Sequence, residues 1–273
     1  MNPSQSLSEG CLRFSCILFL FFLFKGIGYG TSIVLATDDW GEAQPSEVIS
    51  LLEDVTNLLH PNDHSFDSLT IQVGRTQGSP TTLYQPSKSG DTVVHLNTKD
   101  RHWCQYAFQF AHEIGHIICR TKQGNEANQW FEESLCEALS LYALEKLSEL
   151  WATQSSRPRQ VEYASEFLTY KKNRILNSFY PDNFQLPSWW KENRNALKRN
   201  PYLRKQNIWI AIQLEALIEK SPQTALSAIC WLNHEHHDTE NISFENYMAA
   251  WKNSCPEIGQ KEFIHRVMIL FGL

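Results

Sequence analysis

The apolar positions of the chain follow a helical period over most of its length. Between residues 46 and 59 apolar side chains recur at spacings of three and four, which predicts an amphipathic helix. Two stretches in the first hundred residues are instead rich in β-branched residues and predict strands at 69–73 and 91–98. After residue 100 the pattern is helical again, and the predicted helices are 103–119, 129–152, 161–179, 202–220, 224–234, 243–253 and 259–271.

This order of elements predicts an α+β fold that is mainly α. A small mixed N-terminal lobe with a few strands precedes a helical C-terminal lobe. We divide the chain into a leader at 1–36, an N-terminal α/β part at 37–100, a central helix pair at 101–152 and the helical lobe at 153–273.

The leader contains the longest apolar run. Residues 16–24 read CILFLFFLF and are followed by Lys25. This run is too short to cross a hydrocarbon core of ~30 Å as a helix, but it suits a secretory signal peptide. Val34 and Ala36 would then precede the cleavage site. The alternative is an uncleaved membrane anchor over residues 14–35, and under either interpretation we expect an exported protein, periplasmic or secreted.

Composition narrows the function classes. Apolar residues make up 42% of the chain, enough for a packed core, and the mean hydropathy of −0.37 excludes a polytopic membrane protein. The net charge of −6 argues against nucleic acid as a partner. Five cysteines lie outside the leader; Cys230 and Cys255 are candidates for a disulfide, and burial as small apolar side chains is the equal alternative.

A short motif in the helix predicted at 103–119 indicates the chemistry. His112-Glu113-Ile114-Gly115-His116 is an HExxH sequence, which places two imidazoles one turn apart on the same helix face. Histidines so placed can bind one Zn²⁺, and Glu113 can take the proton of a metal-bound water. The alternative is a helix with two hydrogen-bonded core histidines.

A third ligand is expected, because a catalytic zinc ion keeps three protein ligands and one open position. Glu133 follows His116 by 17 positions and lies near the start of the next predicted helix, so a short helix–loop–helix would bring the two together. Glu137, one turn further on, would accept the second ring N–H of a ligating histidine. Glu132 projects about 100° from Glu133 and is the alternative third ligand.

The sequence HEIGH followed by WFEESLCEA resembles the gluzincin branch, or MA clan, of the zinc metallopeptidases. Members pair HExxH with a downstream glutamate ligand, which corresponds here to Glu133, and Glu137 stands where many members have Asp. The resemblance covers about residues 103–140. It implies a zincin-like fold in which extended substrate pairs with the edge of a strand beside the active-site helix, and 91–98 is the candidate strand. It also implies a downstream Tyr or His that stabilises the oxyanion, for which we assign Tyr202.

The resemblance therefore implies zinc-dependent hydrolysis of peptide bonds in a peptide or protein substrate. Internal bonds are favoured, because the chain lacks a GAMEN-like exopeptidase signature. The alternative is a non-catalytic zincin-fold module that binds zinc or peptide. The histidine-rich stretch 233–238 is interpreted as a loop and not as a second metal site.

Overall fold

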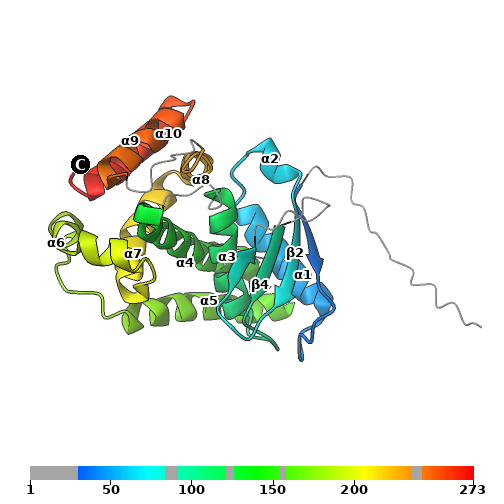
Figure 1. Cartoon of the computed structure of the whole chain (residues 1–273). Coiled ribbons are helices and arrows are strands. Elements are labelled where there is room, and N and C mark those ends of the chain that lie inside the picture. Colours follow the sequence, from blue (N-terminus) through cyan, green and yellow to red (C-terminus); the bar gives the residue numbers. More distant parts are fainter. Residues whose placement is uncertain (1–29, 84–91, 121–125, 154–157, 235–241) are drawn as a thin grey trace, which may run out of the picture.

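The computed structural model describes residues 30–83, 92–120, 126–153, 158–234 and 242–273. Within these ranges the N-terminal elements are β1 (Ser32–Leu35), α1 (Pro45–Leu58), α2 (His64–Asp67), β2 (Thr70–Arg75), β3 (Thr81–Leu83) and β4 (Thr92–Leu96). The helices that follow are α3 (Trp103–Ile118), a 3₁₀ turn at Glu126–Asn128, α4 (Gln129–Thr153), α5 (Pro158–Asn177), α6 (Leu186–Arg199), α7 (Arg204–Lys220), α8 (Pro222–Ile229), α9 (Phe244–Ser254) and α10 (Ile258–Leu270). The predicted α+β, mainly α class is confirmed (Figure 1).

The strands form one mixed sheet in the order β1-β2-β4-β3. β1 and β2 are parallel and joined through α1, β2 and β4 are also parallel, and β3 pairs antiparallel with β4. β4 is therefore an inner strand, which corrects the expectation that 91–98 offers a free edge. Among the described strands, β3 forms the edge of the sheet on that side, and it contacts α3.

α1 and α3 pack against each other and against the sheet, α1 on β1 and α3 on β3 and β4. The apolar stripe of α1 is fully buried at Val48, Leu51, Leu52 and Val55, as its helical spacing predicts. On α3 buried side chains occupy most positions, so the HExxH sequence lies on a helix fixed between the sheet and the next helix.

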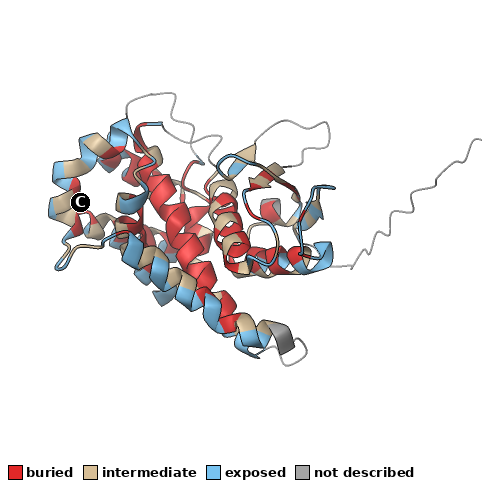
Figure 2. Ribbon diagram, turned by 90° about the horizontal axis from the view of Figure 1, so that it is seen from below, coloured by how far each residue is buried: buried red, intermediate tan, exposed pale blue. Residues whose placement is uncertain are grey.

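α4 is the central helix of the molecule. It packs against α3, α5 and α7, and its residues from Trp130 to Leu144 are buried without interruption (Figure 2). In a helix that is enclosed on all sides, each polar side chain needs a hydrogen-bond or ion-pair partner, because burying an unpaired carboxylate costs free energy. Three glutamates near the start of α4 are buried and therefore need such partners: Glu132, Glu133 and Glu137.

The C-terminal helices enclose the start of α4. Aromatic rings from α4, α9 and the end of the chain pack there in one cluster that includes Trp130, Phe131, Phe244 and Phe271. α6 was not predicted from the sequence. It buries only Leu186, Trp190 and Leu197, and the rest of its surface is polar or half-exposed, so its apolar stripe is thin.

The sheet includes residues that the sequence assigned to the leader. Residues 1–29 lie outside the described residues, but Ser32–Leu35 form β1, and the backbone N–H of Ala36 donates to the carbonyl of Val73. The predicted boundary at residue 36 therefore falls inside the folded part of the chain. None of the helices in the described ranges combines the length and apolar character that a membrane span requires.

The five cysteines of the described chain, Cys104, Cys119, Cys136, Cys230 and Cys255, are all buried and free. Of the two interpretations left open by the sequence, the structure therefore agrees with burial as small apolar side chains.

Candidate metal centre

The candidate metal site depends on a close approach of α3 to α4. Gly115, inside the HExxH sequence, faces Cys136 on α4. A Cβ atom at position 115 would lie 2.9 Å from the Cys136 Sγ and 3.1 Å from its Cα. The glycine therefore lets the two helices approach more closely than any side chain would allow, and this brings the histidines of α3 to the first turns of α4.

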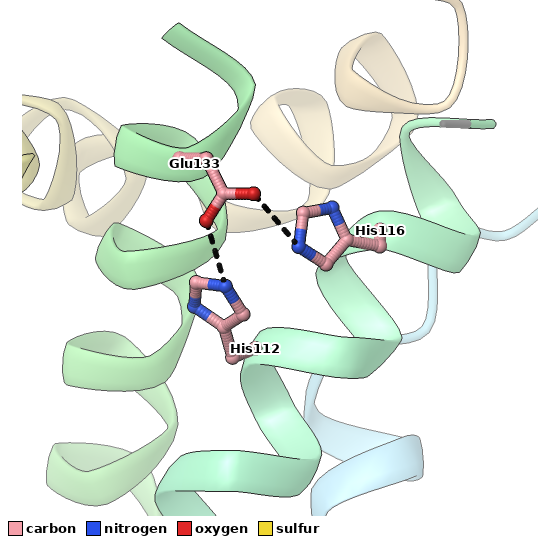
Figure 3. Close-up of side chains that lie close together, drawn as sticks. All are labelled: His112, His116 and Glu133. Carbon is pink, nitrogen blue, oxygen red and sulfur yellow. Dashed lines mark ion pairs between the residues drawn. The ribbon is translucent and has the colours of Figure 1, made fainter. Parts of the chain in front are cut away.

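Glu133 of α4 lies between the two histidines of α3 (Figure 3). Its Oε2 is 3.3 Å from Nε2 of His112, and its Oε1 is 3.5 Å from Nε2 of His116. Ligand atoms bound at ~2.0–2.1 Å to one tetrahedral ion lie about 3.3–3.4 Å apart, and each imidazole lies at about this distance from one of the two carboxylate oxygens. One ligand atom from each of the three residues lies within 4.8 Å of the others. His112, His116 and Glu133 are thus positioned to hold a metal ion.

The other nitrogen of each imidazole faces a different glutamate. Nδ1 of His116 lies 2.8 Å from Oε1 of Glu132, a hydrogen-bond distance. Nδ1 of His112 lies 3.7 Å from Oε2 of Glu137, within ion-pair range. An acceptor on Nδ1 holds a histidine in the tautomer that leaves Nε2 free to bind a metal. Of the two adjacent acids, Glu133 lies with His112 and His116 in the group positioned to hold a metal ion, and Glu132 bonds to the opposite side of the His116 ring.

The electrostatics of this group are strongly coupled. Burial opposes a charge on His116, but the hydrogen bond and charge of Glu132, with the charges of Glu133 and Glu113, raise its pKa to about 9. Burial likewise opposes a charge on Glu133, yet the pKa of Glu133 is lowered by its hydrogen bond to His112 and by nearby positive charges. Without a metal, the site therefore favours ionised carboxylates around a protonated His116 ring. A divalent cation bound there would take the place of the proton on that ring.

Glu132 is itself held by residues from distant parts of the chain. Asn233 donates from Nδ2 to Oε2 of Glu132 at 2.9 Å and to the Cys119 carbonyl at 2.7 Å, and it accepts from the Tyr247 hydroxyl at 2.8 Å. All these partners are buried. Sequence reasoning missed both Asn233 and Tyr247; the only signal was the polar stretch beginning at residue 233. Residues 235–238 of that stretch lie outside the described residues.

A second group of ligand-type atoms, from His116, Glu132 and Cys136, lies behind the first. Cys136 Sγ is 3.5 Å from Nδ1 of His116, the nitrogen already engaged by Glu132. Burial raises the pKa of the Cys136 thiol well above its usual value, so the thiol stays protonated. A protonated thiol is a poor ligand, and the group around Glu133 is the better candidate.

The ligand group opens on a cavity of about 940 Å³. Glu113 also lines this cavity; it is 3% exposed, and its Oε2 accepts a hydrogen bond from the Thr82 hydroxyl at 2.8 Å. Thr82 belongs to the edge strand β3, which sequence analysis did not predict. The edge of the sheet therefore positions the carboxylate expected to act as the base.

The remaining predicted residues have mixed placements. Glu137 lines the cavity and accepts from Arg174 at 2.9 Å, in addition to facing His112. Tyr202 also lines the cavity, but it lies just before α7 and not inside a helix, it is 57% exposed, and its hydroxyl accepts from Gln129 Nε2 at 2.9 Å. Its role at an oxyanion stays a prediction.

Comparison of the chain with protein-family models, with curated proteins and with solved structures finds no match.

Proposed function

We propose that this chain is an exported zinc-dependent metallopeptidase of the gluzincin type that hydrolyses peptide bonds. The observation that carries the proposal is the convergence of His112, His116 and Glu133 at the wall of an open cavity, with Glu113 beside them. A purely structural zinc site is closed by its ligands, whereas this one faces a space large enough for several residues of a peptide.

The residues have separable roles. His112, His116 and Glu133 would hold Zn²⁺, and the ion when bound supplies Lewis acidity for a water and for the scissile carbonyl. The Glu113 carboxylate accepts the proton of the attacking water and then gives it to the leaving amine. Thr82 orients that carboxylate from β3, and Glu132 orients His116. The hydroxyl of Tyr202 is the group we assign to the oxyanion.

The edge strand β3 is the part of the sheet suited to an extended substrate. Thr81 and Thr82 line the cavity, and β3 pairs only with β4 among the described strands. A peptide that adds to its free edge would run past Glu113 and the ligand group. Since such a peptide need not end in the cavity, we favour internal bonds as the site of cleavage.

The proposal is tested by metal analysis and peptide hydrolysis on the same protein. We expect about one zinc per chain and cleavage of a mixed peptide library. Replacing Glu113 by Gln should abolish turnover and leave zinc bound, while the matched change Glu192→Gln, on the exposed face of α6, should alter neither. Turnover that survives in the Glu113 variant would contradict the mechanism.

The same experiment distinguishes the proposed peptidase from the alternative function. A non-catalytic module that binds zinc or peptide predicts bound metal with no cleavage of any library by the unmodified chain. The presence of a buried carboxylate held beside the ligands, at Glu113, favours the enzyme, because a structural site has no use for a base.

A further inference from the structure

A buried asparagine links the two helices that carry the candidate ligands. Asn233 lies in the turn after α8 and is 3% exposed. Its Nδ2 donates to the carbonyl of Cys119, the residue that caps the end of α3, at 2.7 Å, and to Oε2 of Glu132 on α4 at 2.9 Å. Its Oδ1 accepts from the hydroxyl of Tyr247 on α9 at 2.8 Å. Both hydrogens and the oxygen of the amide are therefore used within the protein.

These contacts fix the direction in which the amide of Asn233 points. The Cys119 carbonyl can only accept a hydrogen bond, so the nitrogen of the amide, and not its oxygen, must face that carbonyl. The second hydrogen on the same nitrogen then points at Oε2 of Glu132, and the Tyr247 hydroxyl satisfies the amide oxygen by donating to it. The carboxylate of Glu132 is thus held by a donor whose own orientation is set by the backbone at the end of α3.

The orientation of Glu132 decides what its other oxygen does. With Oε2 bonded to Asn233, Oε1 lies 2.8 Å from Nδ1 of His116. Because a carboxylate oxygen accepts, Nδ1 carries a proton, and Nε2, which lies 3.5 Å from Oε1 of Glu133, is the nitrogen available to a metal. The terminal torsion of a glutamate is broad, so a carboxylate that loses a donor also loses a restraint on its plane. The direction of the His116 ring therefore depends on the amide of Asn233.

We propose that Asn233 and Tyr247 are positioning residues for the candidate metal site. Tyr247 fixes the amide of Asn233, Asn233 fixes the carboxylate of Glu132, and Glu132 presents Nε2 of His116 to the ion. We assign neither Asn233 nor Tyr247 a contact with the metal, the substrate or the attacking water. Both belong to the C-terminal helical part of the chain, which thereby takes part in arranging a ligand on α3. The inference rests on the proposed function, because that function makes His116 a zinc ligand.

The test measures zinc affinity and the state of the His116 ring, and neither measurement needs a substrate. The full chain is titrated with zinc in competition with a chromophoric chelator, and urea unfolding of the metal-free protein measures its stability. Asn233→Leu keeps the branched shape of the side chain and removes its donors and its acceptor, while Tyr247→Phe removes only the hydroxyl. Gln260→Met is the matched control, because Gln260 on α10 is also 3% exposed and its Nε2 donates to the hydroxyl of Ser227 on α8.

We expect zinc affinity to fall about tenfold in Asn233→Leu, the lower limit for the loss of a group that supports a metal ligand. Tyr247→Phe should lower it about threefold, since it removes one neutral hydrogen bond at the far end of the network. Gln260→Met should lower the stability in urea and leave the zinc affinity unchanged. In NMR spectra of the metal-free protein, the Nδ1–H of His116 should resonate far downfield, assigned by its absence in His116→Gln. This signal should shift upfield in the Asn233 and Tyr247 variants and stay in place in the control.

An unchanged zinc affinity in the Asn233 variant, an equal loss in the Gln260 control, or an Nδ1–H signal that does not shift would each overturn the positioning role. If Asn233→Leu fails to fold, Tyr247→Phe decides by the same criteria. Failure of the proposed peptidase activity looks different, because the unmodified chain would then bind zinc, respond to the variants as described and still leave peptides intact. A chain that binds no zinc would overturn both proposals.

Discussion

Gly115 is the position where the smallest chemical change should have the largest effect on the site. Gly115→Ala adds one methyl group where an ideal Cβ would lie 2.9 Å from Cys136 Sγ and 3.1 Å from its Cα and Cβ. The sulfur can rotate, but the Cα belongs to the backbone of α4. The methyl group can therefore be accommodated only if α3 and α4 move apart.

The magnitude follows from two opposing terms. Overpacking in a well-packed core costs about 1–3 kcal/mol. Alanine in the interior of a helix gains up to about 1 kcal/mol over glycine. We therefore expect the free energy of unfolding to fall by up to about 2 kcal/mol. Zinc affinity should fall as well, because His116 is adjacent in sequence to Gly115, while Glu133 lies on the helix that has to move.

Urea unfolding of the metal-free variant, followed by a zinc titration of the folded protein, measures both effects. Gly259→Ala is the matched control: it is also a helical glycine, but its Cβ would meet only Thr224 Cγ2 at 3.5 Å, an ordinary contact. The control should be neutral or slightly stabilising. If Gly115→Ala behaved like Gly259→Ala, the close approach of the helices would not be what positions the ligands.

Two further predictions concern pH and the N-terminal strand. Burial lowers the pKa of His116, but the Glu132 carboxylate and the neighbouring acids outweigh burial and raise that pKa to about 9. Glu132→Gln should therefore lower the pKa of His116 in an NMR titration of the metal-free protein. A raised histidine pKa stabilises the folded state at low pH, so the free energy of unfolding should fall as the pH rises from ~6.5 to ~9. This fall should be smaller in the Glu132 variant than in the unmodified protein. An unchanged pKa of His116 in the variant would refute the prediction. A chain that starts at Thr37 lacks β1 and should be less stable in urea than one that starts at Gly30, and equal stability would show that β1 contributes nothing.

The parts of the fold that could be predicted from the sequence are those set by local spacing. α1, α3 and α4 follow an apolar period or a continuous buried run, and their predicted limits lie close to the observed ones. The pairing of His112 with His116 is equally local, because residues four apart on a helix share a face. Glu133 is one step less local, since it needs only a short connection between two consecutive helices.

The elements that were missed owe their structure to other parts of the chain. β1 lies in a stretch that also reads as the end of a leader, and it becomes a strand by pairing with β2. β3 is only Thr81–Leu83, too short for an alternating pattern, and it is defined by its ladder to β4. Thr82, which holds Glu113, was missed for the same reason. Asn233 reaches Glu132 from 101 residues further along the chain, and Tyr247 in turn bonds to Asn233.

The choice between Glu132 and Glu133 shows where spacing alone stops being informative. The helix geometry states that adjacent side chains diverge by about 100°, so only one of the two can face the cavity side of His116. The structure shows that the other faces the opposite side of the same ring: Glu133 approaches Nε2 and Glu132 bonds to Nδ1. The two acids are therefore not alternatives for one role. Of two neighbouring glutamates, one can act as a metal ligand while the other orients a ligating histidine, provided that the histidine ring lies between them. Whether the ring lies there depends on the distance between α3 and α4, which Gly115 sets.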